Sequence, residues 1–229
     1  MLLSLQPTTV VITVSGPTMN KRLLLPIILL VPAIILPNIN REVIKQYPDK
    51  TPMEIVYREN GTEIAREFID EKGNIKTTGR IPDCSIVLNY PNKTKIELTY
   101  RNNHLWAEKI YSKNGSICQD YNYFNGKRNG LSQTYYKSGK LLGKFNYSNG
   151  LLEGITTGYY ETGELQTETL FKNNKINGLC KEYYQNGKIK VEIMYKNDKY
   201  DGIMNMYREN GQLIKTQIFK EGKLIKTAP

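Results

Sequence analysis

The chain has 229 residues, which is room for one large domain or two small ones. Its 39% hydrophobic and 24% charged residues are ordinary for a soluble protein, and 17 tyrosines with 18 glycines favour β structure. The net charge of +10 lies mainly in residues 111–229. It is compatible with nucleic acid, anionic lipid, an acidic partner or only solvated lysines, because basic balance alone is non-specific.

The cysteines argue against a zinc site. Cys84, Cys118 and Cys180 have no CxxC or CxxH spacing. An odd number leaves at least one thiol free or in an intermolecular bridge. Buried or incidental thiols are the simpler interpretation.

The N-terminal region resembles an export signal. Met19 is followed by Lys21 and Arg22 and then by an apolar run over 23–36. The run of 14 residues is short of the ~20 that a membrane-spanning helix needs. We therefore expect residues 19–37 to be a signal peptide, with an uncleaved membrane anchor as the alternative.

Two consequences follow for the compartment and for the start of the protein. Residues 1–18 are unusual ahead of a signal, and we interpret them as a mis-annotated extension upstream of a true start at Met19. The protein is expected to be exported, in the periplasm, on the outer surface or anchored to the membrane. Nucleic acid is therefore not an expected partner.

Residues 38–110 precede a regular pattern. Prolines 37, 48 and 52 suggest a linker over residues 38–55. Residues 56–110 keep parts of the pattern, such as VYRENG at 56–61, and are expected to be degenerate repeats that cap a stack.

A period of 24 residues governs residues 111–229. Five positions recur in every copy without a gap, so the chain is a repeat protein. The first glycine set is Gly115, Gly139, Gly163, Gly187 and Gly211; the tyrosines four residues earlier are Tyr111, Tyr135, Tyr159, Tyr183 and Tyr207; the second glycine set is Gly130, Gly154, Gly178 and Gly202. An aromatic residue follows each first glycine by eight positions, and Gly, Asn or Asp follows three residues later.

Each copy contains two short segments bounded by turn residues, which predicts a β-hairpin. The position that varies only among Gly, Asn and Asp (126, 150, 174, 198 and 222) is expected to need a positive φ. Residue parity places Leu165 and Phe171 together on one apolar face. The fold class expected is all-β, with antiparallel hairpins in a single twisted, meandering sheet.

The unit Tyr-x3-Gly-x-Leu…aromatic-x2-Gly-x3-Gly resembles the MORN repeat in its bacterial variant, as in YYKSGKLLGKFNYSNGLLEG at 135–154. The resemblance covers 111–222 well, 85–110 loosely and 56–75 faintly. It implies hairpin repeats in an extended sheet used for protein or lipid contact. Related bacterial proteins include exported repeat proteins and antitoxins of toxin–antitoxin pairs.

No catalytic constellation is apparent, and neither a cofactor nor a metal is expected. His104 is expected in a surface turn, and Trp106 is expected to cap the stack. The carboxylates lack the period of a paired site. Asp198 and Asp201 make a weak candidate for calcium.

The leading hypothesis is a non-catalytic, exported scaffold that binds another protein. The alternatives are peripheral binding of anionic lipid through basic turns and action as an antitoxin. Exposed edge strands also make an oligomer conceivable. The candidate contact residues are a tyrosine ladder opposite the apolar face and basic turn residues, namely Tyr136, Tyr160, Tyr184, Lys127, Arg128, Lys175 and Lys199. For the tyrosines, cross-strand packing that stiffens the sheet is the alternative.

Overall fold

The computed structural model describes residues 9–13, 39–49, 51–72, 74–90 and 92–228. In these residues every regular element is a β-strand, and none of them forms a helix suited to crossing a membrane. The expected signal segment, residues 19–37, lies outside the described residues. The chain divides into two compact units, residues 1–107 and 108–229, each described here by itself.

The first unit contains two antiparallel sheets. One has the order β1-β6-β7 and the other β2-β3-β4-β5. The strands are β1 (Thr9–Thr13), β2 (Ile39–Gln46), β3 (Pro52–Glu59), β4 (Thr62–Ile69), β5 (Ile75–Gly79), β6 (Cys84–Asn89) and β7 (Lys95–Arg101), and the unit boundary falls within β8 (His104–Tyr111).

Side chains from both sheets form one buried core in this unit. Ile55 and Tyr57 of β3 are packed with Ile86 of β6 and Tyr100 of β7, all at most 2% exposed. The Tyr57 hydroxyl donates to Glu67 (2.7 Å) and shares a hydrogen bond with the Tyr100 hydroxyl (2.8 Å). Burial raises the pKa of the Glu67 carboxyl.

This unit corrects one expectation. Where the structure describes them, residues 38–55 are not a linker, because β2 pairs with β3 along its length and Ile39 is fully buried. Strands within residues 56–110 contribute to the buried core, and their interpretation as degenerate capping repeats stays a prediction. The turn of VYRENG is retained, with Asn60 and Gly61 both at positive φ.

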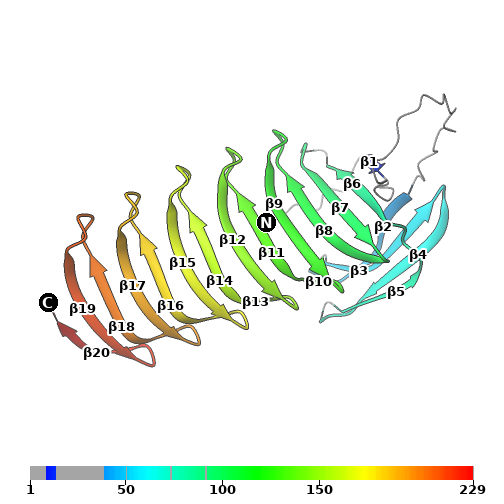
Figure 1. The fold of residues 1–229 in the computed structure, drawn as a ribbon. Helices are drawn as coiled ribbons and strands as arrows, with labels where there is room; N and C mark the ends of the chain where they lie inside the picture. Colours follow the sequence, from blue (N-terminus) through cyan, green and yellow to red (C-terminus); the bar gives the residue numbers. More distant parts are fainter. Residues whose placement is uncertain (1–8, 14–38, 50, 73, 91, 229) are drawn as a thin grey trace, which may run out of the picture. The chain divides into compact units, whose positions relative to one another are not determined.

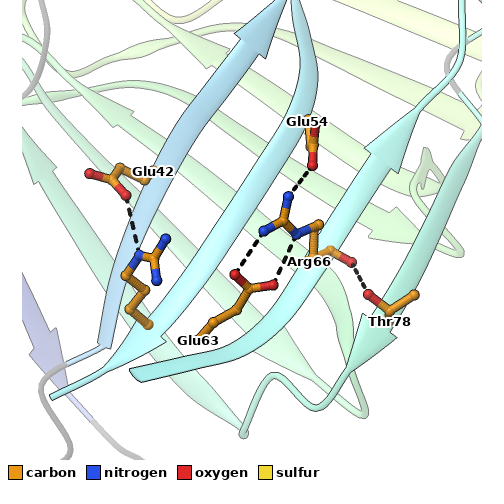
Figure 2. Close-up of polar contacts among 6 residues, drawn as sticks. Glu42, Glu54, Glu63, Arg66 and Thr78 are labelled. Carbon is orange, nitrogen blue, oxygen red and sulfur yellow. Dashed lines mark hydrogen bonds and ion pairs between the residues drawn. The ribbon is translucent and has the colours of Figure 1, made fainter. Parts of the chain in front are cut away.

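The sheet of β2 to β5 carries ion pairs (Figure 2). The Arg66 guanidinium bonds Glu63 through two nitrogens at 2.8 and 2.9 Å and also contacts Glu54. Arg58 lies 3.5 Å from Glu42. These five charged side chains therefore have partners within the unit.

The second unit is one open antiparallel sheet whose strands follow one another in chain order (Figure 1). This confirms the expected all-β meander of hairpins over the regular repeats. After β8, the strands are β9 (Ile117–Phe124), β10 (Lys127–Arg128), β11 (Gly130–Tyr135), β12 (Leu141–Ser148), β13 (Leu151–Leu152), β14 (Gly154–Tyr159), β15 (Leu165–Lys172), β16 (Lys175–Tyr183), β17 (Ile189–Lys196), β18 (Lys199–Tyr207), β19 (Leu213–Lys220) and β20 (Lys223–Ala228).

Two kinds of turn alternate along this sheet. At one end the two central residues of each turn both have positive φ, as in Asn173 (50°) and Asn174 (65°), which is the requirement of a type I′ hairpin. The same holds at 125–126, 149–150, 197–198 and 221–222. At the other end, each glycine of the first set has a positive φ. The expected backbone role of Gly, Asn and Asp is therefore confirmed.

The expected single apolar face is wrong. Gly158 pairs with Thr167, but Tyr159 pairs with Leu165, so a β-bulge interrupts the two-residue alternation. The same shift occurs before Tyr135, Tyr183 and Tyr207. Parity cannot be counted across a bulge, and apolar side chains occupy both faces of the sheet.

Gly163 tests the turn geometry directly. Its φ is +112° with open space around it, so the cost of a β-branched side chain there is backbone strain and not a clash. Gly163→Val should lower the free energy of unfolding by about 1–3 kcal/mol in urea melts. Glu161→Val, in the same turn without a positive φ, is the control and should change stability by less than about 0.5 kcal/mol. Equal melting curves for both variants would contradict the assigned turn.

Candidate binding surface

The back face of the second unit, defined as the face that carries Phe171, is packed by the repeat aromatics. Each of four aromatics lies opposite a glycine of the second set: Tyr147 opposite Gly130, Phe171 opposite Gly154, Tyr195 opposite Gly178 and Phe219 opposite Gly202. All four glycines have a positive φ, and a Cβ at Gly178 or Gly202 would meet Leu170 or Met194 and not the ring. The backbone conformation therefore favours glycine at this position.

Rings and one guanidinium fill the back face between neighbouring hairpins. Tyr200 lies between Tyr195 and Phe219, with ring centroids 5.0 and 5.1 Å away. Arg128 holds the equivalent position three repeats earlier, with its guanidinium 3.8 Å from the ring centroid of Tyr121. Its guanidinium is thus engaged in stacking, and this candidate contact residue contributes to packing.

The three candidate tyrosines link consecutive repeats. The hydroxyls of Tyr136, Tyr160 and Tyr184 donate to the main-chain carbonyls of Tyr159 (2.7 Å), Tyr183 (2.6 Å) and Tyr207 (2.8 Å). All three side chains are half-buried at the hairpin ends, not displayed on a strand face. The tyrosine ladder, a candidate for packing within the sheet or for contact with a partner, therefore forms a set of inter-repeat hydrogen bonds.

The type I′ turns link repeats at the opposite end. The amide of Asn174 donates to the carbonyl of Leu152 (3.0 Å), and the Asn174 side chain accepts from the Leu152 amide (2.6 Å). Asp198 repeats both bonds with Ile176. Where glycine holds this position, only the main-chain bond remains, so Asn and Asp add a hydrogen bond that glycine cannot make.

The front face, defined as the face that carries Ile155 and Leu170, exposes an aliphatic row. The cross-strand pairs are Ile155 with Leu170, Leu179 with Met194, and Ile203 with Ile218. Their exposed fractions run from 38% for Leu170 to 55% for Ile155. We call this set the apolar row: Leu131, Ile155, Leu170, Leu179, Met194, Ile203 and Ile218.

A row of lysines borders the apolar row on the side of the type I′ turns. Three turns are flanked by directly opposed lysine pairs, which we call the lysine row: Lys172 with Lys175, Lys196 with Lys199, and Lys220 with Lys223. All six are exposed. Like charges in directly opposite positions repel, so this arrangement costs stability unless a ligand neutralises it.

On the other side of the apolar row, charges compensate one another. Lys181 lies opposite Glu168 in the strand register and 3.8 Å from Glu192. The Glu168 carboxylate also accepts from the Tyr183 hydroxyl. Burial, with this hydrogen bond and the negative charge of Glu168, raises the pKa of Tyr183 to about 12.

The remaining candidates lie apart from this surface. Lys127 is exposed next to a type I′ turn but faces Phe124 in place of a second lysine. His104 is exposed at the start of β8, and Trp106, the expected cap, is 43% exposed with Arg101 over its ring at 5.3 Å. In the part of the chain that the structure describes, no cluster of three metal-ligating side chains occurs.

The family model described as MORN repeat variant matches residues 128–149, 152–173 and 176–197. These residues are three consecutive MORN repeat variants. No curated protein matches the chain. MORN repeats are generally protein- or membrane-binding motifs, and the family is generally non-catalytic. The matched repeats supply most of the apolar row and two of the six lysines of the lysine row, Lys172 and Lys196.

Sequence reasoning found two of these lysines, Lys175 and Lys199, and missed the apolar row. The signal was present, because an aliphatic residue or Met stands two places before the first lysine of each pair, as in Leu170 and Met194. The bulges concealed it by changing the parity between repeat landmarks. The register of the strands was needed to see that these residues align.

Removing the tyrosine hydroxyls should loosen the contacts between repeats. The triple variant Y136F/Y160F/Y184F loses three hydrogen bonds, each contributing about 0.5–1.5 kcal/mol, so unfolding should cost roughly 2–4 kcal/mol less. Tyr135→Phe is the control for Tyr136→Phe, because the Tyr135 hydroxyl has no hydrogen-bond partner among the described residues. If urea melts show the triple variant as stable as the wild type, these bonds do not join the repeats.

Proposed function

We propose that residues 108–229 are a non-catalytic binding surface for another protein, with the front face as the contact. The observation that carries this proposal is the apolar row. Its members are 38–55% exposed, whereas Val191 and Ile193 on the back face are 9% and 7% exposed. A contiguous row of exposed aliphatic side chains is typical of an interaction site.

The repeat construction supports a scaffold more than an enzyme. Every repeat presents the same face in the same register, so the surface is long and regular. MORN repeats generally bind proteins or membranes. A surface of this kind suits an elongated partner that contacts several repeats together.

The second candidate function is contact with anionic lipid. The lysine row favours it, because exposed lysines near a membrane surface each contribute about 1 kcal/mol of attraction to anionic headgroups. Export belongs to the same proposal. The basic pair Lys21-Arg22 ahead of the apolar run over 23–36 supports it.

A photoreactive amino acid at Ile203 tests the proposal in cells that make the protein. Ile203 lies in the apolar row and is 51% exposed, and Lys137 in a turn at the other end of the hairpins is the control position. We expect a discrete protein adduct from position 203 and none from 137. An adduct of lipid mass would favour the second candidate, and equal or absent adducts at the two positions would contradict both.

A further inference from the structure

The apolar row and the lysine row together define the chemistry of a partner. This inference rests on the proposed function and specifies the partner of the same face. Both rows run across the strands, and each strand from β15 to β19 contributes one side chain to each row. Neighbouring strands lie ~4.8 Å apart, and the six strands from Ile155 to Ile218 therefore extend the apolar row over roughly 24 Å.

The two rows are adjacent on one face. Leu170 precedes Lys172, Met194 precedes Lys196, and Ile218 precedes Lys220 by two residues, so each pair points to the same side of its strand. The separation between the rows is about 7 Å along the strand. The partner therefore meets aliphatic side chains along its middle and positive charge along one flank.

The lysine row keeps much of its charge free. In the part of the chain that the structure describes, Lys220 pairs with Asp201 at 3.3 Å, and the other five form no ion pair within 4.0 Å. Three further carboxylates are near: Asp198, which accepts from the Ile176 amide, Glu153, which accepts from the Asn173 amide, and the exposed Glu221. Six lysines against four carboxylates, with Asp201 included, leave a positive excess at this flank.

We propose that the front face of the repeats docks an acidic amphipathic α-helix, which lies across the strands with its apolar side on the apolar row and its carboxylates on the lysine row. The pitch of an α-helix is 5.4 Å, close to the ~4.8 Å between strands. One apolar side chain per helical turn therefore meets one per strand. An extended peptide repeats its side chains on one face every ~6.6 Å, so its side chains match the spacing of the strands over a shorter distance. A helix of about four turns covers the row.

The charges on the opposite flank of the apolar row favour a helix over an anionic membrane as the partner. Glu168 and Glu192 lie two residues from Leu170 and Met194 on the side away from the lysines. Lys181 lies opposite Glu168 and 3.8 Å from Glu192, so this flank carries two carboxylates and one lysine. Inserting the apolar row into an anionic bilayer would bring the remaining negative charge against its negative surface. A helix roughly 10 Å wide contacts the apolar row and one flank without covering the other.

The test measures binding of two synthetic probes to the full chain by fluorescence anisotropy. One probe is an 18-residue helix with leucines at i, i+3, i+4 and i+7 and glutamates on one flank; the other carries lysines in place of the glutamates. We expect the acidic probe to bind, more weakly at high salt, and the basic probe to bind at least tenfold more weakly.

Variants locate the contact. K172E/K196E/K220E should lower the affinity for the acidic probe at least tenfold. L170N/M194N should lower this affinity by the same factor although its lysines are intact. K113E/K137E/K140E, which makes the same charge change at exposed lysines of the other turns, should stay within about twofold. Circular dichroism melts confirm that each variant is folded.

Two outcomes would overturn the inference. One is absence of acidic-probe binding by the folded wild type, and the other is equal weakening by the control triple. Vesicles containing anionic lipid form a third arm: binding to them that K172E/K196E/K220E abolishes, with no probe binding, assigns the rows to a membrane. Protein adducts at Ile203 without probe binding would retain the proposed function and reject only the helix.

Discussion

The surface of this protein depends on the bonds that hold one 24-residue repeat in register with the next. At one end of the hairpins, type I′ turns such as Asn173-Asn174 bond back to the preceding repeat. At the other end, tyrosine hydroxyls such as that of Tyr160 bond forward to the next. Strands β12 and β14 have only two described paired positions between them. The end contacts therefore supply much of the register there.

The register of the strands aligns the side chains of the apolar row and the lysine row, and these two rows form the candidate binding surface. When equivalent residues align across strands, any side chain type that recurs every 24 residues becomes a line on the sheet. The aromatics opposite glycines pack the back face, and the aliphatic residues before the turn lysines form the exposed front. Two lines of different chemistry side by side can select a partner, because one supplies apolar area and the other charge.

Much of the fold could be predicted from the sequence, because the 24-residue period is marked by residue types that tolerate a positive φ. Gly, Asn and Asp at 126, 150, 174, 198 and 222 indicated positive φ, and hairpins followed. The faces could not be predicted, since a bulge at Leu165 changes parity without leaving a mark in the sequence. The buried core of the first unit was also missed, because its strands share a two-sheet interior and not a period.

The candidate site could likewise be predicted only in part. Lys175 and Lys199 were found because they neighbour the turns, whereas Leu170 and Met194 were hidden by the changed parity. Tyr160 was a candidate both for packing within the sheet and for contact with a partner, and its hydroxyl bonds to the next repeat. A tyrosine adjacent to a repeat landmark carries no sequence signal that separates these two roles.

The most direct test of the central claim is to change the register by one residue. Deleting residues 157–180 removes 24 residues and joins Thr156 to Lys181, which restores the repeat pattern; deleting 157–179 removes 23 and shifts it. Thermal melts by circular dichroism should show one cooperative transition for the 24-residue deletion. The 23-residue deletion should melt at a lower temperature or without cooperativity, because a one-residue slip exchanges the faces. Equal melting of the two deletions would contradict the account.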